Sequence, residues 1–256
     1  MPEVAVYAPG TPMWVDLGTS DIEASKRFYS GLFGWESEDM GEEAGHYHMF
    51  KLRGKNVAGV GPLMMDGQPV AWTTYISTDS ADDTCAKVKT AGGKVFAEPM
   101  DVMDAGRMAI IGDPTGAVFG LWQSNRHTGA EIVNEAGALC WNELSTRDTD
   151  GAKKFYTEVF GWGEETHKGE MDYTEWKVRD KSVGGMMNMT GIVPDQVPPH
   201  WLTYFAVADC DAAAAKAKEL GGKLMTEPRD IPQGRFAVVT DPQGGTFAII
   251  QLKAAE

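Results

Sequence analysis

The sequence predicts an α+β protein made of two tandem copies of one domain, each with a cupped, mostly antiparallel sheet. Residues 14–35 (WVDLGTSDIEASKRFYSGLFGW) and 141–162 (WNELSTRDTDGAKKFYTEVFGW) align without a gap and share 10 of 22 positions. Short alternating segments outnumber helical ones, and the connections between them are too short for a parallel, doubly wound sheet. We therefore expect antiparallel sheets with helices packed on one face.

The repeat continues in the same order along both copies. Trp72-Thr-Thr-Tyr-Ile corresponds to Trp201-Leu-Thr-Tyr-Phe, and Asp113-Pro-Thr-Gly corresponds to Asp241-Pro-Gln-Gly. A period this long indicates a duplicated domain rather than a solenoid, whose repeats are much shorter.

The duplication sets the expected domain boundaries. Residues 125–137 (NRHTGAEIVNEAG) are polar and contain glycine, which is typical of a linker. We place an N-terminal tail at 1–10, a first domain at 11–124 and a second domain at 138–256.

Each copy is predicted to contain two modules, and each module is a strand, a helix and three further strands. In the first copy a strand at 14–18 precedes a helix that a capping box of Ser20 and Glu23 would begin and Gly34 would end. The later elements of this copy are predicted, in chain order, as strands at 36–39, 46–53, 56–63 and 70–77, a helix at 81–91, and strands at 94–102, 107–112 and 117–123.

Composition and charge limit the class of function. The 256 residues are 43% hydrophobic, which suits two globular domains, and no apolar run approaches the ~20 residues that span a bilayer. The N-terminus lacks the pattern of a signal peptide, and three widely spaced cysteines favour a reducing compartment, so we expect a cytoplasmic protein. The net charge of −14 would repel nucleic acid and anionic membranes. The expected partner is a small molecule, and the protein is expected to be a monomer with paired domains or a homodimer.

The sequence resembles the vicinal oxygen chelate superfamily, which includes glyoxalase I, extradiol dioxygenases and bleomycin-binding proteins. The resemblance rests on Phe28-Tyr-x-x-x-Phe-Gly-Trp after the first strand and Asp113-Pro-x-Gly before the last, and it covers 11–253. The Trp-x-Glu/Asp-Leu-x-Thr opening of each copy is similar to a two-domain, glyoxalase-like hydroxylase or antigen group of actinobacteria. The resemblance implies a sheet curled into a cup, with a ligand inside it.

The resemblance also implies a divalent metal held at three strand positions. In this sequence those positions fall, copy by copy, on Trp14, Thr73 and Gly120, and on Trp141, Leu202 and Ala248. Of these residues, Thr73 alone could serve as a ligand for a first-row metal, and a weak one. We therefore predict no cofactor, with a Zn, Ni, Mn or Fe site as the disfavoured alternative.

Strand alternation predicts which side chains face the cup. Asp16 and Glu143 would face it, and a carboxyl group beside a buried indole is a candidate general base. Ion pairing with a local arginine, or solvation at the mouth of the cup, is the alternative. The predicted ligand-binding side chains are Trp14, Tyr75, Trp122, Trp141, Tyr204, Arg107 and Arg235. The tryptophans could instead fill the cup, and the arginines could form ordinary ion pairs.

His46 and His48 are the weak candidates for a metal site. They are two residues apart in a predicted strand and would share one face. Their counterparts in the second copy are Asp172 and Thr174, and no third ligand can be identified.

These observations predict a small-molecule binding protein of the glyoxalase and bleomycin-resistance type. It would hold a hydrophobic or aromatic metabolite or drug in a cupped sheet, without the usual metal. The alternative is a glyoxalase-like lyase or isomerase, or a hydroxylase or dioxygenase-type oxidoreductase, using Asp16 and Glu143 or an atypical metal site. A protein-interaction module is a third possibility.

Overall fold

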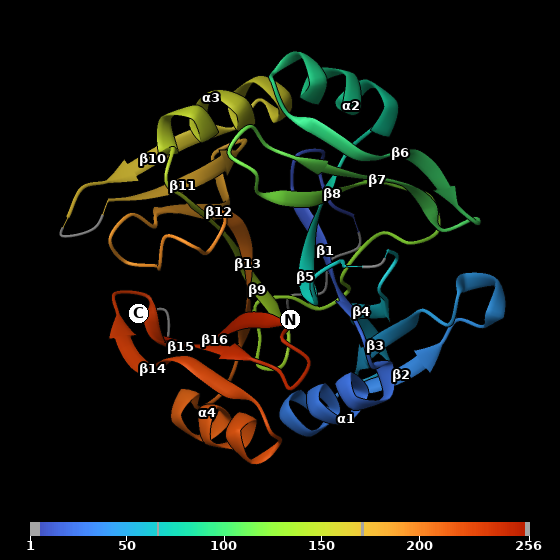
Figure 1. Cartoon of the computed structure of the whole chain (residues 1–256), viewed down its shortest axis with the longest axis vertical. Coiled ribbons are helices and arrows are strands. Elements are labelled where there is room, and N and C mark those ends of the chain that lie inside the picture. Colours follow the sequence, from blue (N-terminus) through green and yellow to red (C-terminus); the bar gives the residue numbers. More distant parts are fainter. Residues whose placement is uncertain (1–5, 66, 170–171, 254–256) are drawn as a thin grey trace.

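The computed structural model describes residues 6–65, 67–169 and 172–253. The first five residues of the predicted tail and the last three of the predicted second domain lie outside this part of the chain. Two eight-stranded sheets carry one pair of helices each, and Figure 1 shows α2 beside α3 at one end of the molecule and α1 beside α4 at the other.

The strands and α-helices follow the same order in the two copies, and the first copy has in addition the short 3-10 helix η1. The first comprises β1 (Pro12–Thr19), α1 (Ile22–Phe33), β2 (Glu36–Asp39), η1 (Glu42–Ala44), β3 (His48–Leu52), β4 (Lys55–Pro62), β5 (Ala71–Ser77), α2 (Ala81–Thr90), β6 (Lys94–Val102), β7 (Gly106–Gly112) and β8 (Val118–Ser124). The second comprises β9 (Leu139–Thr146), α3 (Thr149–Phe160), β10 (Gly163–His167), β11 (Tyr173–Val178), β12 (Lys181–Asn188), β13 (His200–Ala206), α4 (Cys210–Glu219), β14 (Lys223–Ile231), β15 (Gly234–Thr240) and β16 (Thr246–Leu252).

Each sheet is mixed but mostly antiparallel, which confirms the predicted α+β class. The first has the order β2-β3-β4-β1-β5-β8-β7-β6, and the second repeats it with the corresponding strands. The parallel pairs are β1 with β4 and β5 with β8, while the two modules of the sheet meet where β1 runs antiparallel to β5. Parallel neighbours need a crossover between them, and here the helix and the intervening strands provide it.

Two local predictions were wrong in detail. The N-cap of α1 is Asp21, whose carboxylate accepts a hydrogen bond from the backbone N–H of Ala24 at 2.9 Å, so Ser20 is not part of a capping box. The strand expected from residue 46 begins at His48, because Gly45 and His46 both have left-handed backbone conformations that form a turn. Gly34 ends α1 with φ 73°, as predicted.

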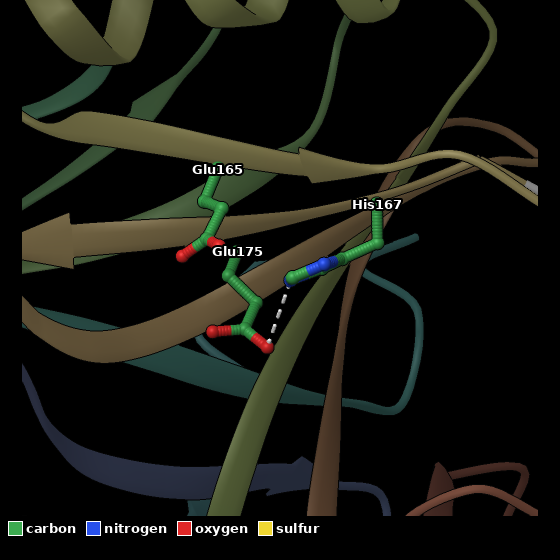
Figure 2. A group of neighbouring side chains, drawn as sticks. All are labelled: Glu165, His167 and Glu175. Carbon is green, nitrogen blue, oxygen red and sulfur yellow. Dashed lines mark ion pairs between the residues drawn. The ribbon is translucent and has the colours of Figure 1, made fainter.

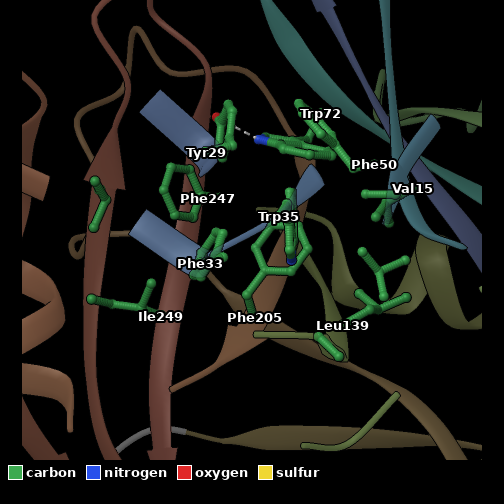
Figure 3. Packing of buried hydrophobic residues seen from close by; sticks show 14 of the residues in the cluster. Val15, Tyr29, Phe33, Trp35, Phe50, Trp72, Leu139, Phe205, Phe247 and Ile249 are labelled. Carbon is green, nitrogen blue, oxygen red and sulfur yellow. Dashed lines mark hydrogen bonds between the residues drawn. The ribbon is translucent and has the colours of Figure 1, made fainter. Parts of the chain in front are cut away.

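The helix-bearing faces of the two copies pack against each other crosswise. One core joins α1, β1 and the neighbouring strands of the first copy to β13, α4 and β16 of the second, and Figure 3 shows Tyr29, Phe33 and Trp35 against Phe205 and Phe247. A second core joins α2 and β8 to α3 and β11. Since burying one such side chain contributes about 1.5–3 kcal/mol, much of the stabilisation lies between the copies.

A buried hydrogen-bond network also crosses between the copies. The Tyr29 hydroxyl on α1 donates to Asp241 Oδ2 at 2.8 Å and accepts from Trp72 Nε1 at 3.0 Å. The mirrored set is Tyr156, Asp113 and Trp201, with both bonds at 3.0 Å. The Phe-Tyr motif of each copy is therefore completed by the Asp-Pro-x-Gly motif of the other.

The segment 125–137, expected to be a polar linker, lies against the first sheet. Ala130 and Ile132 are buried, and the Ala130 N–H donates to the carbonyl of Met13 in β1 at 2.9 Å. The hydroxyl of Tyr7 donates to the Ala130 carbonyl at 2.7 Å. Ala130 packs on the face of the sheet that points away from the helices, whereas Ile132 packs in the core on the helix side. No helix in the described residues has the length and apolar character of a membrane span.

Candidate functional site

The face of the first sheet opposite its helices is concave, and we call it the first cup. Trp14, Tyr75 and Trp122 from its central strands form one cluster with Met49 on β3 and Met108 on β7, which lie on opposite wings of the sheet. Leu202, Tyr204, Phe236, Ala248 and Ile250 form the corresponding cluster of the second cup. In Figure 1 the central strands β1 and β5 of the first sheet face β13 of the second, so the cups point away from each other. A hydrogen bond joins the two sheets at this place, because the Thr74 hydroxyl on β5 donates to Asn142 Oδ1 on β9 at 2.8 Å.

A connected set of polar groups occupies the centre of the first cup. Trp14 and Asp16 are alternate residues of β1, so both point into the cup. The indole Nε1 of Trp14 donates to the Tyr47 hydroxyl at 3.0 Å, and that hydroxyl donates to Asp16 Oδ2 at 3.2 Å. The hydroxyl of Tyr75, which is paired with Trp14 in the neighbouring strand, bonds to the same carboxyl group.

The second cup repeats this network. Trp141 Nε1 donates to the Tyr173 hydroxyl at 2.8 Å, and the Tyr204 hydroxyl donates to Glu143 Oε1 at 3.0 Å. Tyr173 also bonds to Glu143. The structure thus brings together the predicted Trp, acid and Tyr of each copy, although their role in ligand binding stays a prediction.

Sequence reasoning missed Tyr47 and Tyr173. Both lie on the cup face over a glycine of the next strand, where a Cβ atom at Gly59 or Gly185 would overlap the tyrosine hydroxyl. The glycine-rich strand near residue 59 signals such a close approach. The two tyrosines also correspond at the offset of 126 residues that relates His46 to Asp172, so the repeat contains the signal that identifies them.

Burial controls the charge of both acids. Desolvation raises the pKa of Asp16 to about 7, against the two tyrosine hydrogen bonds that lower it. Burial likewise raises the pKa of Glu143, which is 6% exposed, whereas Asp16 keeps more contact with solvent. Among the described residues no Lys or Arg forms an ion pair with either acid, so the alternative of a local arginine partner is not seen.

Arg107 and Arg235 lie on the other face of their sheets, and the structure does not bring them to the cups. Arg107 on β7 faces α2, where its guanidinium contacts Asp82 at 2.8 Å and Asp101 at 3.0 Å. Arg235 forms the mirrored pairs with Asp211 at 2.7 Å and Asp230 at 3.2 Å. Because Met108 and Ile110 take the cup-facing positions of β7, its odd-numbered residues point toward the helix. The ion-pair alternative describes both arginines.

His46 and His48 do not form a joint site. His46 is exposed in the turn, with Nδ1 3.0 Å from Asp39 Oδ2. His48 is buried on the side of β3 that faces α1, where burial and the nearby Lys26 lower its pKa. The shared strand face that the i, i+2 spacing implied is lost because the strand starts after His46.

One group of possible metal ligands occurs in the described part of the chain: Glu165 and His167 on β10 with Glu175 on β11 (Figure 2). His167 Nε2 lies 3.4 Å from Glu175 Oε1. The ammonium group of Lys177 already contacts Glu165 at 3.0 Å and Glu175 at 2.9 Å. This arrangement is an ion-pair network at the wing of the second sheet, away from the family's ligand positions.

Of the six residues at the family's ligand positions, only Thr73 has an oxygen that could bind a metal ion, and a lone hydroxyl is a weak ligand. The indole of Trp14 offers an N–H donor rather than a lone pair, and that N–H is bonded to Tyr47. At Gly120 there is no side chain, and a Cβ atom would overlap the ring of Tyr75. In the second copy Leu202 and Ala248 are likewise without donor atoms.

The comparisons with known proteins agree with this fold. The sequence profile of the Glyoxalase/Bleomycin resistance protein/Dioxygenase superfamily matches residues 12–121 and 128–249. The chain therefore belongs to this superfamily, with one match in each copy.

Two relatives resemble the chain along nearly its whole length. The protein CFP32 of Mycobacterium bovis, provisionally named a glyoxylase, is 46% identical over 264 residues, covering 98% of each chain. The anthracycline biosynthesis protein DnrV of Streptomyces peucetius is 40% identical over 264 residues, covering 96% of this chain and 95% of the relative.

Solved structures share the fold at low sequence identity. The Mn(II)-bound glyoxalase from Novosphingobium aromaticivorans has a TM-score of 0.64 at 19% identity, covering 97% of this chain and 86% of that one. The 2,3-dioxygenase LapB from Pseudomonas sp. KL28 has a TM-score of 0.66 at 13% identity, covering 97% and 94%.

Proposed function

We propose that this protein binds a planar aromatic small molecule in a cup, without the metal centre that the family's fold can hold. The observation that supports it most directly is the Trp–Tyr–acid–Tyr network in each cup, whose tryptophan occupies a strand position where the family has a metal ligand. A binding site for a flat ligand combines aromatic and apolar walls with a few polar groups that fix orientation.

The first cup offers such a surface. Trp14, Tyr75 and Trp122 form its buried floor, while Met49 and Met108 are partly exposed and can adapt to a ligand. The second cup is more polar at the equivalent wing, where Glu175 takes the place of Met49. The name of the Streptomyces peucetius relative also supports an aromatic ligand, because anthracyclines contain a planar anthraquinone.

We expect the uncharged probe 2-(hydroxymethyl)anthraquinone to bind the protein and to quench its tryptophan fluorescence. Met49→Glu should weaken this binding by about tenfold or more, because the ligand would have to desolvate a carboxylate on the apolar wing. The measurement is a fluorescence titration, with equilibrium dialysis to count bound probe, on protein purified without chelators and analysed for metals.

Two variants serve as controls. Arg107→Ala, on the opposite face, should leave the affinity unchanged, and Glu175→Met should not reduce it. Absence of binding to the wild type would refute the proposal, and stoichiometric Zn, Ni, Mn or Fe in the purified protein would refute its metal-free part.

The raised pKa of Asp16, about 7, supports a second candidate function, an enzyme that uses this carboxyl group for proton transfer. A group that exchanges its proton near neutral pH is suited to general acid–base catalysis. In that case a bound aromatic ketone or phenol would be converted over time, and Asp16→Asn would abolish the conversion. A probe that is recovered chemically unchanged after prolonged incubation argues against this candidate.

A further inference from the structure

The first cup contains a buried side chain, His127, that does not come from a strand of the sheet. His127 lies in the segment between the copies, and its backbone fixes it to the first cup. Its N–H donates to the Ala105 carbonyl at 2.9 Å, and its carbonyl accepts from Trp122 Nε1 at 2.9 Å. The imidazole ring meets Trp14 edge-on, with ring centroids 4.4 Å apart, and Trp122 at 5.4 Å. Three aromatic rings therefore form a box in the first cup.

The ring nitrogen Nε2 of His127 is buried without a hydrogen-bond partner among the residues that the structure describes. The residue is only 9% exposed. Leaving such a group unpaired costs about 1–3 kcal/mol, so nearly all buried polar groups in proteins have a partner. Five other buried polar atoms in the described residues also lack a partner, so it is the position of this nitrogen beside Trp14 and Trp122 in the cup that indicates a ligand contact.

The imidazole is neutral at physiological pH. Burial lowers the pKa of His127 to about 4, although the nearby Glu131 acts in the opposite direction. A neutral imidazole has one donor and one acceptor nitrogen, so Nε2 is the donor in one tautomer and the acceptor in the other. A hydroxyl group can satisfy both tautomers, because it can donate or accept. A carbonyl group could satisfy only the protonated Nε2.

Among the residues that the structure describes, the second cup has no comparable box. At the offset of 128 residues that relates Phe119 to Phe247, Trp122 corresponds to Ile250 and His127 to Ala255. Ile250 is buried in the cluster of the second cup, while Ala255 lies outside the described residues. The aromatic box is thus a feature of the first cup that the duplication does not repeat.

We infer that His127 determines specificity in the first cup, where its Nε2 hydrogen-bonds to a phenolic hydroxyl of the planar aromatic ligand. This inference rests on the proposed function and adds the ligand's chemical class and the cup that selects it. Tyr7, held at the edge of the same cluster by its bond to Ala130, would move aside to admit the ligand. Asp16, on the same face, would supply a second polar contact.

The experiment compares two uncharged probes, 2-(hydroxymethyl)anthraquinone and its 6,7-dihydroxy derivative, whose phenolic hydroxyl groups are too far from the quinone carbonyls to form internal hydrogen bonds with them. The wild type should bind the dihydroxy probe about tenfold more tightly, with one tight site per chain. His127→Phe keeps the aromatic edge contacts to Trp14 and Trp122 and removes the ring nitrogens. It should abolish the tenfold preference and leave the affinity for the plain probe unchanged. Circular dichroism and Tm would establish that the variant is folded.

A second measurement uses the wild type alone, so it does not depend on the folding of the variant. The ¹⁵N shift of His127 Nε2, assigned by NMR, should move when the dihydroxy probe binds and not when the plain probe binds. The inference is overturned if the preference survives in His127→Phe, if two sites of equal affinity prefer the dihydroxy probe, or if the nitrogen shift does not respond to it. If neither probe binds the wild type, the proposed function fails first, so the two failures are distinguishable.

Discussion

Asp241→Ala should lower the free energy of unfolding by about 3 kcal/mol or more. One carboxylate oxygen of Asp241 accepts hydrogen bonds from the backbone N–H groups of Gln243, Gly244 and Gly245 at 2.8–2.9 Å. The other accepts the hydroxyl of Tyr29, which comes from the other copy. The side chain is 3% exposed, so water cannot easily replace it. The substitution therefore removes both the hydrogen bonds that hold this turn and the hydrogen bond to Tyr29 between the copies.

Tyr29→Phe separates these two effects. It removes only the hydroxyl between the copies, and it leaves Asp241 Oδ2 and Trp72 Nε1 without a partner, at an expected cost of about 1–2 kcal/mol. Tyr156→Phe should cost a similar amount, because Tyr156 makes the mirrored bonds to Asp113 and Trp201.

Urea unfolding at pH 7 measures these differences. Asp104→Ala, which removes an exposed partner of Arg126, is the control and should leave the unfolding midpoint almost unchanged. An Asp241→Ala protein as stable as this control would show that the network does not hold the copies together.

The raised pKa of Asp16 should make the free energy of unfolding fall as the pH rises from 4 to 8, and Asp16→Asn should remove this contribution. The lowered pKa of His127 acts in the opposite direction between about pH 4 and 6.5. The pKa of Asp16 is about 7 in the folded protein, against 3.8 for the free side chain. Between these values the folded protein binds a proton that the unfolded chain has lost, so folding weakens with increasing pH. The stabilisation is complete below pH 4 and is lost by about pH 7.

The size of the effect follows from the shift. Each pKa unit of the shift corresponds to about 1.4 kcal/mol of unfolding free energy. Because Asp16 keeps partial contact with solvent, we expect its total contribution to be about 2 kcal/mol. At pH 8 Asp16→Asn should therefore be more stable than the wild type by about that amount, while near pH 4 the two should be equal. Because burial also raises the pKa of Glu143, Glu143→Gln should change stability in the same direction.

Unfolding curves at several pH values test this prediction. Asp101→Asn alters an acid on the exposed edge strand β6 and should not change the slope of stability against pH. If Asp16→Asn leaves that slope intact, Asp16 is ionised in the folded protein at neutral pH.

The sequence was sufficient to predict most helices and strands and the residues that form the floor of each cup. A period of two along β1 places Trp14 and Asp16 on the face opposite Val15 and Leu17, and the structure has the first pair in the cup and the second in the helix-side core. Alternation is a local property of a strand, so no knowledge of distant contacts is needed. The same reasoning failed at His46 because a turn replaced the start of the strand.

The arginines show where a repeated residue misleads. Arg107 and Arg235 recur in both copies, which is compatible with ligand binding and with a structural ion pair. Only the partners decide between these roles, and the aspartates of α2 and α4 lie more than twenty residues away in sequence. Strand β7 pairs with β8 without a bulge, so its side chains alternate regularly between the two faces of the sheet. This alternation places Arg107 on the helix side.

By itself, the sequence determined that this protein is a duplicated domain of the vicinal oxygen chelate type with a Trp and an acid in each cup. The tertiary structure alone decided that Tyr29 of one copy bonds Asp241 of the other, that Tyr47 closes over Gly59, and that His127 enters the first cup. Periodicity and repeats report on residues close in sequence or equivalent in the two copies. Contacts between the two sheets depend on how the copies pack, because the sequence around one residue of such a contact does not indicate which residue is its partner.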